Sequence, residues 1–138
     1  MYRNNLDRLA RKHETARASV PQPIADEAGN AVAILAYGTT HHAVVEARDR
    51  LRDAGIQTDY LRVRALPLST DVRAFIERHE RVYVVEQNRD GQLRAILDTE
   101  LTGDLIDRLR SIRHYNGVPI DAAAITEPLL TAEEPVLA

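Results

Sequence analysis

Three apolar segments, separated by stretches with helical spacing, set the pattern of this sequence. The segment "AVAILAY" (31–37) is continuously apolar, "QTDYLRVRAL" places Leu61 and Val63 on one face, and "RVYVVE" (81–86) ends in a carboxylate. A continuous apolar run is typical of a parallel strand with helices on both faces. We therefore predict parallel strands over 31–37, 57–63 and 81–86.

Helices are predicted after each of these strands. Their buried positions are Val44, Ala47, Leu51 and Ala54 in the first, Val72, Phe75 and Ile76 in the second, and Leu93, Ile96 and Leu97 in the third. Gly55 suits the position just after a helix, and Ser69 or Thr70 suits an N-cap. Alternation of strands and helices predicts an α/β fold of three layers, α/β/α, around a mostly parallel sheet of about five strands.

The ends of the chain differ from this central part. Residues 2–17 are charged, with Leu6, Leu9 and His13 at helical spacing, which indicates a short surface helix. Two prolines within 19–30 indicate a linker or extended arm. We expect 1–30 to form a helix and connector that precede the domain.

The last part of the chain is expected to complete the fold. Leu105, Ile106 and Leu109 suggest one further helix, and 111–119 a strand and turn. Asp121 suits the cap of a small helix that ends at Ile125. The domain is thus predicted over 31–126, and the acidic tail over 127–138 is expected to be loosely held.

Composition narrows the possible functions. With no cysteine among 138 residues, this chain holds no disulfide, thiolate-ligated iron–sulfur cluster or Cys nucleophile. A net charge of −3 and 4% aromatic residues give no indication of a nucleic-acid surface. No apolar run approaches the ~20 residues of a membrane span, and the charged opening contains no signal peptide. We expect a cytoplasmic protein.

The turn "YGTTHH" is one candidate site. Gly38, Thr39, Thr40 and His41 lie between a strand and a helix, where free backbone N–H groups can hold a phosphate. The turn lacks the further glycines of a dinucleotide fingerprint and the GK[ST] of a P-loop, so ordinary capping by threonine is the favoured interpretation. Adjacent His41 and His42 point about 100° apart on a helix, which makes a shared metal ion unfavourable.

The sequence "EQNRDGQ" is the densest polar cluster. Glu86 ends a buried strand, and Gln87, Asn88 and Gln92 add amide groups around Gly91. A lone carboxylate can act in acid–base chemistry, but no second base is visibly paired with it. The favoured interpretation is that Glu86 is hydrogen-bonded at a domain or subunit contact, so no catalytic residue is assigned.

Residues 33–97 resemble the transketolase C-terminal-like domain: a strand ending in Gly-Thr, a helix closing on Ala-Gly-Ile, a strand leading into Leu-Pro, and a strand ending in Val-Glu-Gln-Asn before Gly-Gln-Leu. The last element looks most like the alpha subunit of 2-oxoacid:ferredoxin oxidoreductases of the 2-oxoglutarate or pyruvate type. "HYNGVPIDAAAI" (114–125) and the opening of the chain are similar to the closing segment and the connector of that subunit.

The resemblance implies a role in a larger enzyme. The family carries out CoA-dependent oxidative decarboxylation of a 2-oxo acid with thiamine diphosphate, Mg and iron–sulfur clusters. The Gly-Asp-Gly…Asn motif for Mg–diphosphate and the cluster cysteines are absent from this sequence. We therefore expect those cofactors elsewhere in the complex and none in this chain. The expected partners are the pyrimidine-binding domain of the alpha subunit and the beta subunit, in a homo- or hetero-oligomer.

Under this hypothesis, 86–92 is a joint rather than a catalytic centre, with Glu86, Gln87, Asn88, Gly91 and Gln92 at an interface. Two alternatives remain open: the matching domain of a transketolase or of a dehydrogenase E1 beta-type subunit, and a free-standing module that binds an anion at Gly38–His41. The sequence does not indicate which 2-oxo acid is used.

Overall fold

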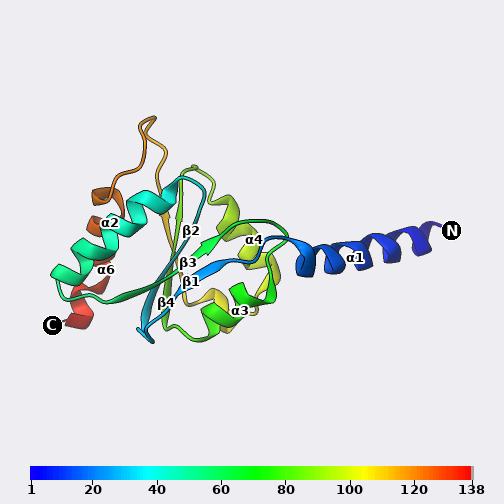
Figure 1. Ribbon diagram of the computed structural model, residues 1–138, viewed down its shortest axis with the longest axis horizontal. Coiled ribbons are helices and arrows are strands. Elements are labelled where there is room, and N and C mark those ends of the chain that lie inside the picture. Colours follow the sequence, from blue (N-terminus) through cyan, green and yellow to red (C-terminus); the bar gives the residue numbers. More distant parts are fainter. Residues whose placement is uncertain (138) are drawn as a thin grey trace.

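The computed structural model describes residues 1–137, with side chains described through residue 134. Five strands form one sheet in the order β1-β3-β2-β4-β5 (Figure 1). They are β1 (Ile24–Asp26), β2 (Val32–Tyr37), β3 (Thr58–Val63), β4 (Arg81–Glu86) and β5 (Leu109–Arg113). The pairs β2–β3, β2–β4 and β4–β5 are parallel, and β1–β3 is antiparallel. The prediction of a mostly parallel five-stranded sheet is confirmed.

Helices lie on both faces of this sheet. They are α1 (Tyr2–Ser19), α2 (Thr40–Asp53), α3 (Thr70–Glu77), α4 (Gln92–Glu100), the short α5 (Gly103–Ile106) and α6 (Ala123–Leu137). In Figure 1, α2 and α6 cover one face, and α3 and α4 cover the other. The three-layer α/β/α architecture predicted from the sequence is therefore confirmed.

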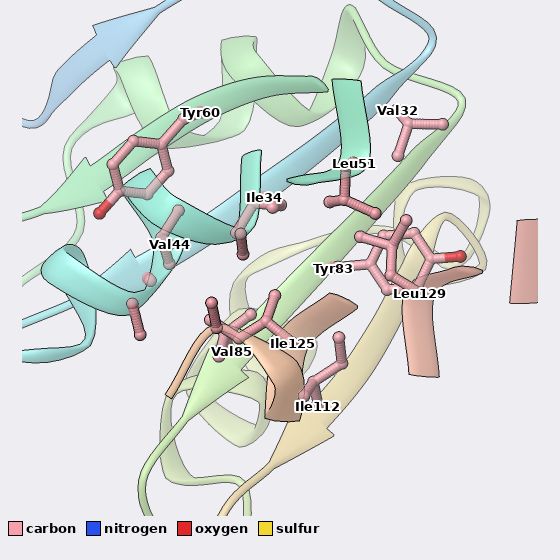
Figure 2. Packing of buried hydrophobic residues seen from close by; sticks show 14 of the residues in the cluster. Val32, Ile34, Val44, Leu51, Tyr60, Tyr83, Val85, Ile112, Ile125 and Leu129 are labelled. Atoms are coloured by element: carbon pink, nitrogen blue, oxygen red, sulfur yellow. The ribbon is translucent and has the colours of Figure 1, made fainter. Parts of the chain in front are cut away.

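The apolar run of β2 is buried on both faces, as a central strand requires. Ile34 and Ala36 face the side of α2 and α6, and Ala33 and Leu35 face the side of α3 and α4. All four side chains are fully buried. Figure 2 shows the first face, where labelled residues of the sheet meet Val44 and Leu51 of α2 and Ile125 and Leu129 of α6.

The C-terminal part differs from the sequence expectation. The helix expected around 105–109 ends at Ile106, and Leu109 begins β5 instead. The segment expected to be a loosely held tail instead continues α6 as far as Leu137, and residue 138 of that segment lies outside the described residues. Leu129 is fully buried and Glu133 is 2% exposed, so this helix packs on the sheet.

A partly buried ion pair attaches α6 to β4. Glu133 accepts hydrogen bonds from Arg81 Nε at 2.8 Å and from the Tyr83 hydroxyl at 2.6 Å. Burial, reinforced by the bond to Glu133, raises the pKa of Tyr83. Charge in the tail therefore serves a structural contact, which the acidic composition alone does not indicate.

The N-terminal segment lies largely outside the core. Helix α1 buries none of its residues and projects from the domain, as expected for a surface helix (Figure 1). The arm expected over 19–30 contributes β1, which pairs with β3. Among residues 1–137, no helix combines the length and apolar character that crossing a bilayer requires.

Candidate functional site

The parallel strands β2, β3, β4 and β5 end at one edge of the sheet, which we call the carboxyl edge. The chain leaves β2 toward the face of α2 and leaves β4 toward the face of α4, so these neighbouring strands form a topological switch point. Ligands of open α/β sheets bind at such points. The turns after Tyr37 and Glu86 are therefore the first place to look for a site.

Glu86 is fully buried at this point, and its carboxylate caps the next helix. Its Oε1 accepts the Leu93 N–H at 2.6 Å, and its Oε2 accepts the Arg94 N–H at 3.1 Å. These N–H groups belong to the first turn of α4, where no intrahelical acceptor exists. A negative charge there also interacts favourably with the helix dipole. The polar end of β4 is thus explained by the helix that follows it.

Asn88 completes this cap. Its Oδ1 accepts the Gln92 N–H at 3.1 Å, and its Nδ2 donates to Glu86 Oε1 at 3.1 Å and to the Tyr37 hydroxyl at 3.2 Å. Burial, with the nearby Glu86 charge, raises the pKa of Tyr37. The first three N–H groups of α4 all have side-chain acceptors from the end of β4.

Gly91 allows the chain to turn back onto Glu86. It adopts φ +62°, a left-handed conformation that favours glycine, immediately before α4. A Cβ at this position would lie 3.6 Å from Glu86 Oε2 and 3.5 Å from Arg113 Cδ. The glycine of "RDGQ" therefore serves the compact cap, whereas Gln92 is exposed.

The candidate anion turn lies directly beside this cap. Gln87 Nε2 donates to Thr39 Oγ1 at 3.2 Å and to Thr40 Oγ1 at 3.1 Å, so the two turns are joined. Neither threonine caps α2 with its side chain in the way we favoured from the sequence. Thr40 is buried, while Gly38 and Thr39 are exposed.

His41 closes the other side of the turn. Its Nδ1 lies 3.2 Å from the Tyr60 hydroxyl, and its ring stacks on that of Tyr60. Burial, together with the charges of Arg62 and His42, lowers the pKa of His41. The four residues 38–41 do lie together, and anion binding by them stays a prediction.

A groove of about 380 Å³ opens beside the carboxyl edge, which sequence reasoning did not find. Tyr37, Val63, Leu66 and Ile96 supply apolar walls, and Arg64 stands at its margin. Leu66 is 54% exposed, in the turn that we expected to follow β3. The sequence predicts a turn at Leu66-Pro67, but it does not show that this turn lies beside α4 and forms a groove with it.

The carboxyl edge does not fit a Mg–diphosphate group. Within the described part of the chain, its buried carboxylate is that of Glu86, and both oxygens are engaged by N–H donors of the chain itself. A cation there would have to displace the cap of α4.

A second buried polar cluster lies at the opposite edge and was also missed from the sequence. Asp59, 1% exposed, accepts N–H groups from Ala28, Gly29 and Asn30 at 2.9–3.2 Å and the Asn30 side chain at 2.6 Å. His79 Nε2 bonds with Asp59 Oδ2 at 3.0 Å. Burial would raise the pKa of Asp59, but these hydrogen bonds together lower it.

This cluster is not a convincing metal site, although three potential ligands converge in it. Oxygen or nitrogen atoms of Glu27, Asp59 and His79 lie within 4.8 Å of one another. Glu27 is paired with Arg78 at 2.9 Å, and Asp59 already accepts five hydrogen bonds. The cluster instead fastens the turn before β2 to β3 and to the end of α3.

We predicted an interface at 86–92 because the polar groups at the end of a buried strand need hydrogen-bond partners. Glu86 and Asn88 have partners inside the domain, so they do not require a neighbouring chain. Gly91 is buried under the same cap, whereas Gln87 and Gln92 are exposed. An interface at these five residues stays a prediction, and it now rests on the exposed amides.

Comparison with known proteins places the chain in a family context. No family model matches it. The alpha subunit of 2-oxoacid:ferredoxin oxidoreductase 2 from Aeropyrum pernix is 35% identical over 112 residues, which cover 77% of this chain and 17% of that subunit. The chain therefore spans a small part of its relative's length.

Two solved structures share the fold. The 2-oxoglutarate:ferredoxin oxidoreductase from Magnetococcus marinus, with 2-oxoglutarate, coenzyme A and succinyl-CoA bound, matches with a TM-score of 0.73 at 21% identity, over 86% of this chain and 21% of that one. The alpha chain of a probable 2-oxoacid ferredoxin oxidoreductase from Thermoplasma acidophilum matches with a TM-score of 0.50 at 18% identity, over 85% of this chain and 98% of that one. This protein is a homologue of the alpha subunit of 2-oxoacid:ferredoxin oxidoreductases, and it spans 17% of the alpha subunit from Aeropyrum pernix.

Proposed function

We propose that this chain is a non-catalytic assembly domain of a thiamine-diphosphate-dependent 2-oxoacid:ferredoxin oxidoreductase. The observation that carries the proposal is its 35% identity to an alpha subunit of which it spans 17%. The complete enzyme would decarboxylate a 2-oxo acid, such as pyruvate or 2-oxoglutarate, in the cytoplasm. This chain would contribute surface and position rather than reacting groups.

The chemistry of the carboxyl edge supports a non-catalytic role. A general acid or base must reach a substrate proton with a free oxygen or nitrogen. Glu86 is fully buried, and its two oxygens accept three hydrogen bonds from the domain. The sequence also contains no cysteine to ligate an iron–sulfur cluster. Thiamine diphosphate, Mg and the clusters would accordingly be held by the other parts of the complex.

The exposed surface supports a role in assembly. Large apolar side chains stand in solvent in α1 and in the turn between β5 and α6, which holds Tyr115 and Val118. Tyr115 is 61% exposed and Val118 is 59% exposed. Tyrosine is enriched among the residues that carry most of the binding energy in protein interfaces. The pyrimidine-binding domain and the beta subunit are the proposed partners.

The proposal is tested by mixing. The chain is purified alone and with the pyrimidine-binding domain and beta subunit of the same oxidoreductase, and both samples are studied by sedimentation velocity. We expect a stoichiometric complex in the mixture. If the chain sediments independently of the other proteins at concentrations near 10 μM, the assembly role is contradicted. The dissociation constant would then exceed that concentration, and the binding free energy would be smaller than about 7 kcal/mol in magnitude.

A further inference from the structure

The helix α1 projects from the domain (Figure 1), and it carries an apolar face that is open to solvent. Tyr2, Leu6 and Leu9 are 78%, 49% and 57% exposed, and the helix buries none of its residues. Its last turn is attached to the domain through Arg17, which pairs with Glu100 at 2.8 Å and donates to the Leu68 carbonyl. The helix is therefore held at one end, while its apolar part has no cover among residues 1–137.

The spacing of this face suits a helical partner or an elongated groove. Tyr2, Leu6, Leu9, His13 and Ala16 are separated alternately by four and three residues, as in the seam of a coiled coil. At 100° per residue, the five positions fall within an arc of about 80°. Helices in proteins gain most of their stability from packing of an amphipathic face, so cover from a partner would stabilise α1 as well as bury its apolar face.

The margins of the face are basic. Arg8 and Lys12 lie on one side, and Arg3 and Arg17 lie on the other, where Glu14 pairs with Arg17 at 3.4 Å. Helix α1 has five basic and two acidic side chains, formally +3, so the rest of the chain carries a formal −6 of the total −3. Arg3, Arg8 and Lys12 form no ion pair with any residue that the structure describes.

We propose that α1 is a docking helix for another subunit or domain of the oxidoreductase, whose surface offers an apolar groove bordered by carboxylates. This inference rests on the assembly role proposed above and specifies the chemistry of the partner. Carboxylates would pair with the basic margins, and the groove would cover Leu6 and Leu9. Complementary charges of this kind also exclude wrong partners.

A second copy of this chain is a poor occupant. Pairing two α1 helices, in either direction, brings basic margins together, because Arg3 and Arg17 flank one side and Lys12 the other. The groove of about 380 Å³ beside Leu66 is apolar, but Arg64 stands at its margin. The charge on α1 therefore favours a different protein surface.

The test uses the whole chain and two synthetic amphipathic peptides of three heptads. Both peptides have leucine at the seam, and they differ only in flanking positions, which are glutamate in one and lysine in the other. Fluorescence anisotropy should show binding of the acidic peptide at least about tenfold tighter than that of the basic peptide, and weakening as salt rises. Leu6→Asp should abolish binding, while circular dichroism shows the fold of the domain intact.

A pair of neighbouring substitutions separates docking from general charge attraction. Lys12 borders the apolar face, whereas Arg11 lies about 180° from its centre at nearly the same height. Lys12→Glu should weaken binding of the acidic peptide at least about fivefold, and Arg11→Glu should change it by less than about twofold. Equal effects of the two variants, or equal binding of both peptides, would overturn the proposal.

Other occupants give distinct results. A dimer of the chain alone that Leu6→Asp dissociates would overturn the proposal in favour of a second copy. Duplex DNA binding that Lys12→Glu and Arg11→Glu weaken equally would overturn it in favour of a polyanion. When mixed with the other oxidoreductase subunits, the wild-type chain should assemble with them, and the Leu6→Asp variant should not. Failure of the wild-type chain to assemble contradicts the proposed function, and the peptide measurements still decide the chemistry of α1.

Discussion

The buried carboxylate of Glu86 provides a sharp test of why the end of β4 is polar. We consider Glu86→Gln, which keeps the shape of the side chain but removes its charge and replaces one acceptor with a donor. In the native protein, Oε1 and Oε2 receive N–H groups of Leu93 and Arg94, and Asn88 donates to Oε1 as well. A glutamine can serve one of the two main-chain donors but not both.

The expected destabilisation follows from these contacts. One buried donor left without an acceptor costs about 1–3 kcal/mol. Loss of negative charge at the N-terminus of α4 costs a further 0.3–2 kcal/mol, roughly. We expect Glu86→Gln to lower the free energy of unfolding by about 2–4 kcal/mol. The melting temperature should fall by roughly 3–5 °C for each kcal/mol in a chain of this size.

Urea unfolding followed by circular dichroism measures this change. Glu127→Gln is the matched control, since it makes the same chemical change at an exposed position of α6 and should shift stability by less than about 0.5 kcal/mol. Equal unfolding midpoints for Glu86→Gln and the wild type would refute the capping role. In that case Glu86 would be free for the interface role that we predicted from the sequence.

Three further predictions concern the other buried groups and the cofactor. The hydrogen bonds that lower the pKa of Asp59 stabilise the fold fully above about pH 4, and this contribution is lost as pH falls through the pKa of the folded state. The urea midpoint of the wild type should therefore fall more steeply between about pH 6 and pH 2 than that of Asp59→Asn. Parallel curves for the two proteins would contradict this prediction. Tyr83→Phe should lower the free energy of unfolding by about 1–2 kcal/mol, because the hydroxyl that donates to buried Glu133 is lost. Unchanged hydrogen-exchange protection of α6 in this variant would argue against the link between Tyr83 and that helix. Calorimetry of the isolated chain should detect no thiamine diphosphate binding at micromolar concentrations with Mg present, and a measurable micromolar affinity would show that a diphosphate site exists here.

The sheet could be predicted from the sequence because its strands are marked directly. The segments 31–37 and 81–86 are long, apolar and flanked by amphipathic helices, and this pattern is typical of buried parallel strands. Leu109 was assigned to a helix because three apolar residues fell at helical spacing, yet pairing with β4 places it in a strand. Long-range pairing outweighed the local pattern at that position.

The polar sites could be predicted only in part. The cluster at 86–92 was noticed, but the role of Glu86 depends on N–H groups seven and eight residues later that only the folded turn brings back. Asp59 and His79 lie 20 residues apart in unrelated segments, and no spacing rule connects them. The exposed face of α1 was visible as a thin stripe, since a surface helix needs no tertiary partner to reveal its pattern.

The central proposal is that this chain supplies a domain of a 2-oxoacid:ferredoxin oxidoreductase without supplying its reacting groups. Reduction of ferredoxin by the other subunits, with a 2-oxo acid, CoA and thiamine diphosphate present, measures this directly when the chain is left out and then added back. The account predicts that activity depends on the chain and saturates at one equivalent, although the chain alone is inactive. Full activity of the other subunits without the chain would contradict it.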